Sequence, residues 1–155
     1  MAIKIENKSI FEAPKGAIIL QQVNCQNAMG SGFAKAIYSR YPIVKQKYHD
    51  YCEGKHPNSL LGTVLPVRTN DYMFYNLFGQ LYYGRSSETS KCYTNYDAVG
   101  HMLHKIALKH EGDPSVKIAI PYNMCCGLAG GDWNIILKLI QTYLKYLDVT
   151  IYKIE

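Results

Sequence analysis

The chain has 155 residues, enough for one domain that buries a core without a disulfide or metal to staple it. Hydrophobic residues make up 48% and charged residues 19%, which excludes a disordered, fibrous or membrane-embedded chain. The net charge of +5 favours ligands that carry phosphate. The basic residues are scattered, however. No strand-like run interleaves basic and aromatic residues in the way that an RNA-binding sheet would require.

Neither the start of the chain nor any later stretch resembles a signal peptide or a membrane span of roughly 18 apolar residues. We therefore expect a cytoplasmic protein with no membrane partner. No cofactor or metal is expected, because the five cysteines lack C-x-x-C spacing and are predicted to be reduced thiols. They are Cys25, Cys52, Cys92, Cys125 and Cys126.

The first half of the chain alternates short β-branched or aromatic runs with helical periodicity. Strands are predicted at Ile3–Ile5, Ala17–Val23, Leu61–Val67 and Met73–Phe78. Helices are predicted at Gly32–Arg40 and Ile43–Glu53, separated at Pro42, with a turn at Gly54–Ser59.

The second half continues the alternation. A polar surface loop is predicted at Gly84–Lys91, helices at Tyr93–His110 and Asp132–Leu147, and strands at Val116–Pro121 and Val149–Ile154. This order predicts one α/β domain over residues 1–155, with three α/β/α layers and a mixed, mostly parallel central sheet. In such sheets ligands bind beyond the carboxyl ends of the strands.

A glycine-containing loop, residues 25–32, joins the second predicted strand to the first predicted helix. Gly30 and Gly32 allow backbone N–H groups to approach a pyrophosphate, and the helix start adds its positive end. Lys35 stands where a dinucleotide fingerprint needs its third glycine, and no P-loop sequence occurs. This first glycine loop therefore predicts neither a Rossmann site nor a nucleoside triphosphatase.

A second glycine loop, residues 122–131, follows the fifth predicted strand and precedes an apolar helix. It contains Gly127, Gly130 and Gly131. Asp132 is predicted to cap that helix, and Trp133 to anchor it in the core. Two such loops at strand ends predict a single anionic site suited to a diphosphate.

At these loops the sequence resembles the macrodomain family, in particular its branch of ADP-ribose-1″-phosphate phosphatases and related small hydrolases. The resemblance covers essentially the whole chain and implies the macrodomain fold. Its segments are Gln22-Val23-Asn24-Cys25-Gln26, Met29-Gly30-Ser31-Gly32-Phe33-Ala34, Tyr41-Pro42, Tyr51-Cys52-Glu53, Leu60-Leu61-Gly62 and Cys126-Gly127-Leu128-Ala129-Gly130-Gly131-Asp132-Trp133.

The resemblance implies that the turn after the first strand contacts adenine, with Ser9 in place of the usual acidic or amide residue. Tyr152 either stacks on adenine or packs as an ordinary strand residue. Asn24 and Asn27 are implied to hold the distal ribose, and the alternative for Asn27 is a role in turn geometry only. The full set implied to contact the ligand is Ser9, Ile10, Gln22, Val23, Asn24, Asn27, Met29, Gly30, Ser31, Gly32, Phe33, Ala34, Asn123, Met124, Cys125, Cys126, Gly127, Leu128, Ala129, Gly130, Gly131 and Tyr152.

Catalytic groups are harder to assign from the resemblance. Gln80 and Ala129 stand where some members have a Lys and an Asp, and Gln21 where some phosphatases have a His. The five histidines are expected on helices or turns away from the glycine loops. Asn24 is the one catalytic candidate, as a residue that positions substrate, and no general base is identified.

The predicted function is binding of ADP-ribose or a derivative, with hydrolysis of ADP-ribose 1″-phosphate to ADP-ribose and phosphate. Three alternatives stay open. The first is a non-catalytic module that recognises ADP-ribosylated macromolecules or sequesters a nucleotide. The second is a remover of ADP-ribosyl modifications, and the third is a basic nucleic-acid binder, which would show steep salt dependence.

Overall fold

The computed structural model describes residues 3–30, 32–82, 92–126 and 129–154. Within them one sheet has six strands in the order β1-β6-β5-β2-β4-β3. Every neighbouring pair is parallel except β3 with β4, so the predicted mixed, mostly parallel sheet is confirmed. The strands are β1 (Lys4–Glu6), β2 (Ile18–Asn24), β3 (Val64–Arg68), β4 (Met73–Gln80), β5 (Lys117–Pro121) and β6 (Asp148–Tyr152).

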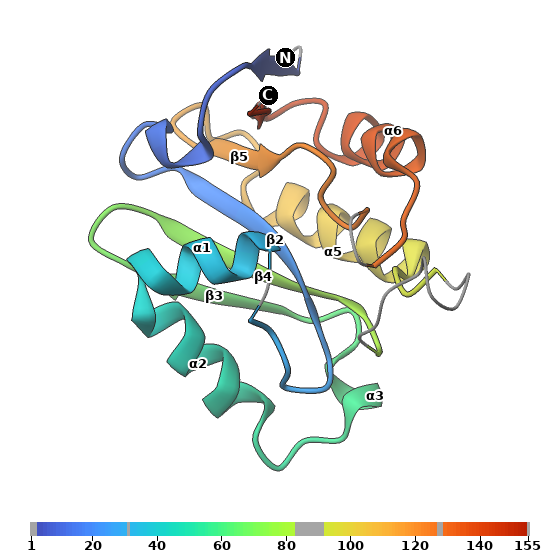
Figure 1. Ribbon diagram of the computed structural model, residues 1–155. Helices are drawn as coiled ribbons and strands as arrows, with labels where there is room; N and C mark the ends of the chain where they lie inside the picture. The colour runs from blue at the N-terminus through green and yellow to red at the C-terminus, as the bar shows by residue number, and fades with distance from the viewer. Residues whose placement is uncertain (1–2, 31, 83–91, 127–128, 155) are drawn as a thin grey trace.

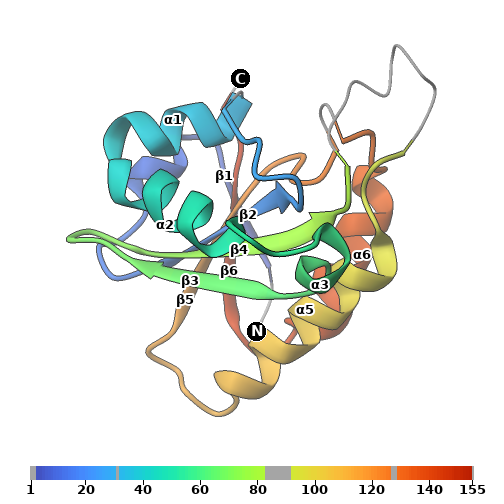
Figure 2. The same ribbon diagram turned by 90° about the horizontal axis from the view of Figure 1, so that it is seen from below.

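Helices cover both faces of the sheet, which gives the predicted three layers (Figures 1 and 2). On one face lie α1 (Gly32–Arg40) and α2 (Pro42–Cys52), and on the other lie α5 (Tyr96–Lys109) and α6 (Trp133–Tyr143). The short elements are η1 (Ile10–Glu12) and α3 (Pro57–Leu60). Of the helices in the described residues, none has the length and apolarity to cross a bilayer.

Strand β2 lies in the middle of the sheet, and all seven of its residues are buried. Ile18 and Leu20 face the core beneath α5 and α6, whereas Ile19 faces the core beneath α1. This alternation follows from the two-residue period of a strand covered on both faces. It also sends Gln21 and Gln22 into opposite layers.

Two expected element boundaries were wrong for identifiable reasons. The helix predicted from Tyr93 begins at Tyr96, because the Tyr93 backbone N–H donates to the Ala129 carbonyl (2.7 Å) and the Asn95 side chain caps the helix. The turn predicted at Gly54–Ser59 includes the start of α3, where Pro57 occupies the first turn and His56 Nδ1 accepts from the next free N–H (3.1 Å).

Three further elements begin later or end earlier than expected. The strand predicted from Leu61 begins at Val64, because Gly62 has φ +84° and turns the chain. The helix predicted to reach Leu147 ends at Tyr143, and the last strand ends at Tyr152. The surface loop predicted at Gly84–Lys91 lies outside the described residues.

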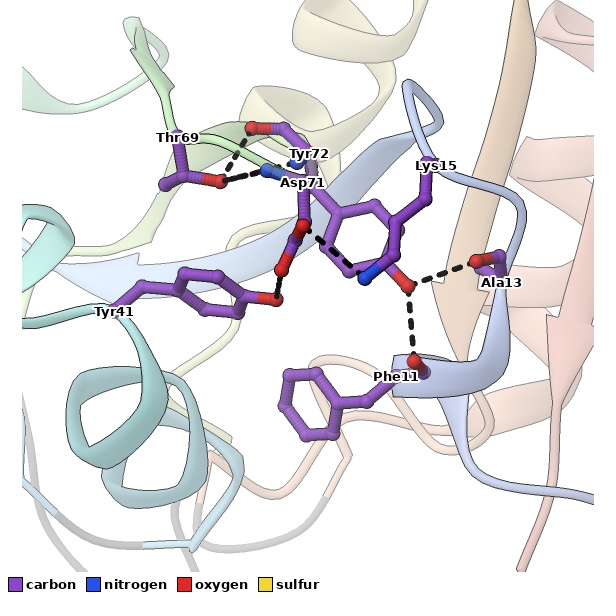
Figure 3. Close-up of polar contacts among 7 residues, drawn as sticks. All are labelled: Phe11, Ala13, Lys15, Tyr41, Thr69, Asp71 and Tyr72. Carbon is purple, nitrogen blue, oxygen red and sulfur yellow. Dashed lines mark hydrogen bonds and ion pairs between the residues drawn. The ribbon is translucent and has the colours of Figure 1, made fainter.

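A polar cluster ties the η1 segment to the turn between β3 and β4 (Figure 3). The Tyr72 hydroxyl lies 2.9 Å from the Phe11 carbonyl oxygen and 2.8 Å from that of Ala13. Beside it the Tyr41 hydroxyl donates to Asp71 at 2.8 Å. These contacts fix η1, and with it the turn after β1, against the α1 and α2 layer.

Candidate functional site

The two glycine loops leave the sheet at neighbouring strands. β2 and β5 are parallel and adjacent, with Ile18 opposite Ile118. The first glycine loop leads from β2 to α1 on one face, and the second leads from β5 to α6 on the other (Figure 1). Chain paths that diverge from adjacent strand ends define the crevice where open α/β sheets bind ligands.

Both loops contain residues in an uncommon backbone conformation. Among the described residues, three other than glycine have positive φ: Asn27 at +59°, Asn123 at +65° and Cys125 at +72°. All three lie in the two glycine loops. Such conformations cost energy and gather at functional sites, where the surrounding structure holds them in place.

Within the first glycine loop, the Asn24 side chain is used by the protein itself. Its Oδ1 accepts from the backbone N–H groups of Gln26 (3.0 Å) and Ala28 (3.3 Å), and its Nδ2 donates to the Ala28 carbonyl (2.8 Å). Asn24 is only 1% exposed. These contacts give Asn24 a role in shaping the loop, and its role in positioning substrate stays a prediction.

The last turns of α2 support the same loop. The Tyr48 hydroxyl donates to the Asn24 carbonyl (2.8 Å) and accepts from the Ala28 N–H (3.2 Å). The next residue, His49, contacts the Asn27 side-chain oxygen through Nδ1. The expectation that every histidine lies away from the glycine loops was therefore wrong, because the reversal at Pro42 returns α2 to the loop where α1 begins.

The second glycine loop is closed mainly by its own backbone. The Gly131 N–H donates to the Cys125 carbonyl (3.0 Å), and the Cys126 N–H donates to the Asn123 carbonyl (2.9 Å). A Cβ on Gly131 would lie 2.4 Å from the Cys125 oxygen, so this position requires glycine. The Thr94 hydroxyl also donates to that oxygen, at 2.6 Å.

Beneath the loops the strand ends carry uncharged amides. Gln22 Nε2 donates to Gln80 Oε1 and to Thr94 Oγ1, both at 3.0 Å, and Gln80 Nε2 donates to the Tyr82 carbonyl at 3.0 Å. Gln22 and Gln80 are each 8% exposed. We name Gln22, Gln80 and Thr94 the amide floor. It links both strands to the second glycine loop through Thr94.

Gln21, predicted to stand where a catalytic histidine would be, lies in the other layer. Its side chain is 2% exposed and donates to Asn76 Oδ1 at 2.7 Å. Because neighbouring strand residues face opposite sides, Gln21 points toward α1 and away from the amide floor. The side chain at position 21 therefore lies among buried groups of that layer.

The cysteines of both loops are held as thiols. Burial, and secondarily Cys52, raises the pKa of Cys25 to about 12. Burial also raises the pKa of Cys126 to about 11, with a smaller effect from Asp132, and raises that of Cys125 well above its usual value. Since the thiolate is the nucleophile, these groups are poorly suited to covalent catalysis near neutral pH.

The predicted adenine contacts lie at the ends of β1 and β6. Ser9 forms a capping box with Glu12, in which its Oγ accepts from the Phe11 N–H (3.2 Å) and its own N–H donates to Glu12 (3.1 Å). Tyr152 is 7% exposed and packs in the core with Ile10. Its burial favours the packing interpretation, and stacking on adenine stays a prediction.

The remaining predicted contacts divide by exposure. Asp132 caps α6 by accepting from the Asn134 N–H at 2.8 Å, as predicted, and Trp133 packs against Tyr122 with ring centroids 5.1 Å apart. Ser31, Gly127 and Leu128 lie outside the described residues. The exposed or half-buried contacts are Asn27, Met29, Gly30, Gly32, Phe33, Asn123, Cys126, Gly130 and Gly131, whereas Val23, Ala34, Met124, Cys125 and Ala129 are buried.

Sequence reasoning missed Tyr48, His49 and Thr94. No local signal marks Tyr48 and His49, because their contacts join residues twenty or more positions apart in the sequence. Thr94 was placed inside a predicted helix. Thr94 instead pairs with Gln80 as an isolated β-bridge, and predicting that pairing would have required knowing where the strands end.

Comparison with solved structures identifies the fold. A Bacteroides thetaiotaomicron protein of unknown function superposes with a TM-score of 0.85 at 24% identity, over 99% of both chains. A Streptomyces coelicolor macrodomain protein gives 0.76 at 21% identity, over 99% of this chain and 100% of that one. A Thermosipho africanus DarTG in complex with ADP-ribose gives 0.77 at 20% identity, over 97% of this chain and 41% of that one. The chain therefore has the macrodomain fold.

Sequence comparison points to one branch of that fold, and the resemblance drawn from the two loops is confirmed. A protein named ADP-ribose 1″-phosphate phosphatase from Aspergillus oryzae is 36% identical over 52 residues, which are 34% of this chain and 26% of that protein. One of the same name from Aspergillus clavatus is 34% identical over 58 residues, 37% of this chain and 29% of that protein. The matches thus span less than a third of these relatives. No protein-family model matches the sequence.

Proposed function

We propose that the two glycine loops bind the diphosphate of ADP-ribose or of a derivative such as ADP-ribose 1″-phosphate. The observation that carries this proposal is that the three non-glycine residues with positive φ, among those described, all lie in the two loops beside adjacent strand ends. Loops held in that conformation present backbone N–H groups to an anion. The complex of a similar fold with ADP-ribose supports the same ligand.

The rest of the ligand is proposed to extend to either side of the diphosphate. Adenine would lie toward Ser9, Ile10 and Tyr152, and the distal ribose toward Asn27. Asn27 is exposed and has an amide that suits ribose hydroxyls. Asn24 would act indirectly, by keeping the loop in the shape that presents Asn27.

Hydrolysis of ADP-ribose 1″-phosphate is the proposed reaction, supported by the names of the matching relatives. Water would attack the 1″-phosphate and the bond from phosphorus to the ribose oxygen would break, releasing phosphate and ADP-ribose, while loop N–H groups stabilise the developing charge. The neutral amide floor and the protonated cysteines favour the alternative, a module that binds ADP-ribose on macromolecules without turnover. Removal of ADP-ribosyl groups through a lysine is disfavoured, because Gln80 has no amine.

The binding proposal is tested by substitution at Gly30. A Cβ on Gly30 would meet nothing within 4 Å, so a side chain fits there without strain. Gly30→Glu should weaken ADP-ribose binding at least about tenfold by placing a carboxylate beside the diphosphate, whereas the neutral control Gly30→Gln should stay within about threefold. Calorimetry on both folded variants measures this. Equal affinities would remove the first glycine loop from the site.

Turnover is tested separately. Phosphate release from ADP-ribose 1″-phosphate is measured beside ADP-ribose affinity on the same preparation. Release that saturates with substrate supports the phosphatase. Tight ADP-ribose binding without release supports the binding module, and binding of single-stranded RNA with a steep salt dependence would support the nucleic-acid alternative.

A further inference from the structure

The last turns of α2 present successive side chains to the first glycine loop, and only one of them is partly exposed. Tyr48 is fully buried and holds the loop backbone through its hydroxyl. His49, next in the chain, is half-buried and contacts the Asn27 side chain at the loop surface. The rings of Tyr48 and His49 meet edge to face, with centroids 5.3 Å apart. The buried tyrosine therefore fixes the place of the imidazole.

Asn27 is held in two ways. Its backbone has φ +59°, a left-handed conformation that asparagine tolerates better than most residues, and the residue is exposed. Its amide oxygen is engaged by His49 Nδ1. When Nδ1 carries the proton and donates to this oxygen, the Asn27 NH₂ group is left to donate to a ligand.

We propose that His49 is a positioning residue that orients the Asn27 amide to recognise the distal ribose, and so sets the preference of this site for ADP-ribose over ADP. This inference rests on the proposed function, because it assumes that the first glycine loop holds a diphosphate. ADP carries the diphosphate and adenine but lacks the distal ribose. The ratio of the two affinities therefore isolates the ribose contact from binding at large.

The proposal predicts that His49 acts through Asn27. His49→Ala should lower ADP-ribose affinity about three- to tenfold, the worth of one hydrogen bond, and leave ADP affinity within about twofold. Asn27→Gly keeps the positive φ without strain and should have the same effect. The double variant should be no worse than either single one, because both remove the same contact. His49→Gln, which retains a side-chain donor, should restore part of the preference.

The experiment measures ADP-ribose and ADP binding by calorimetry for these variants, with His104→Ala as the matched control. His104 is an exposed histidine on α5, where its ring contacts Tyr143. Loss of the ADP-ribose preference in His49→Ala, with no further loss in the double variant, supports the proposal. If His49→Ala keeps the preference for ADP-ribose over ADP, the proposal for His49 is overturned and the proposed function stays in place. Additive losses in the double variant have the same consequence. A wild type that binds neither ligand overturns both.

Discussion

The two glycine loops are held by different means. The first is held by side chains from another element, since Tyr48 bonds to the backbone at Asn24 and Ala28. The second is held chiefly by backbone hydrogen bonds between its own residues, of which the one from Gly131 to Cys125 closes the turn. Both loops nevertheless reach the same uncommon backbone conformation.

This difference determines which substitutions each loop tolerates. A loop closed by its backbone is most sensitive where a side chain cannot fit, and less sensitive to the identity of neighbouring side chains. A loop held from outside is sensitive to distant residues that touch no ligand. The first glycine loop should therefore respond to changes in α2, and the second to changes in its own glycines.

The largest effect is expected at Gly131. Gly131→Ala would place a methyl group 2.4 Å from the Cys125 carbonyl oxygen, which is backbone and cannot move aside cheaply. The free energy of unfolding should fall by about 2 kcal/mol, as for other overpacked sites. Denaturant titration measures it. Gly30→Ala, in open space in the first loop, should change stability by less than about 0.5 kcal/mol. A similar loss of stability at both positions would contradict the proposed difference between the two loops.

The next largest effect is expected at Tyr48. Tyr48→Phe removes a buried hydroxyl that bonds to the first loop and takes its donor from the Asn24 carbonyl, at a cost of about 1–2 kcal/mol in unfolding free energy. ADP-ribose affinity should fall with it. Tyr75→Phe is the control, because Tyr75 is also buried and its hydroxyl bonds to His110 at 2.8 Å, away from both loops. Tyr75→Phe should lose stability and keep its ADP-ribose affinity. A loss of affinity in Tyr75→Phe with none in Tyr48→Phe would show that α2 does not support the site.

A smaller effect is expected at Thr94. Thr94→Val keeps the shape of the side chain and removes the hydroxyl that joins the amide floor to Cys125. Both partners keep another hydrogen bond, so about 1 kcal/mol should be lost. Thermal or chemical unfolding measures the change, with Thr142→Val on the exposed surface of α6 as the control. No difference between the two variants would mean that the loop needs no outside support.

The smallest effect is expected at a site that touches neither loop and sets the baseline. Hydrogen bonds from Lys117 and then Lys4 lower the pKa of Asp148. The ion pairs contribute stability fully above the unfolded pKa of about 3.9, and this contribution is lost as pH falls through the lowered folded pKa. Asp148→Asn should cost about 0.5 kcal/mol at neutral pH. The difference in unfolding free energy between Asp148→Asn and wild type should shrink on acidification. A difference that grew in acid would contradict a lowered pKa of Asp148.

Much of the fold could be predicted from the sequence because its signals are local. The periodicity from Gly32 to Arg40 matches α1 residue for residue, and the alternating order of strands and helices implied the layers. The glycine loops were recognisable because backbone approach to an anion requires glycine between a strand and a helix.

The supports of the loops could not be predicted, because they depend on the path of the chain. Tyr48 meets Ala28 only because α2 runs back along α1 after Pro42, and helical periodicity does not give that direction. The alternation along β2 shows that Gln21 and Gln22 face opposite layers, but not which of them faces the ligand. The equivalence of Gln21 to a catalytic histidine therefore stays a prediction.

The amide floor also bears on how such a site changes over generations. A glutamine codon becomes a lysine codon by one nucleotide, so an amine at position 80 is a short mutational step. That step would remove one of the two acceptors of Gln22 Nε2 and would bury an ammonium at a position now 8% exposed. Burial lowers the pKa of a lysine and penalises its charged form. We therefore expect a lysine at position 80 to be tolerated only where its amide partner changes as well, so that single substitutions tend to keep this site uncharged.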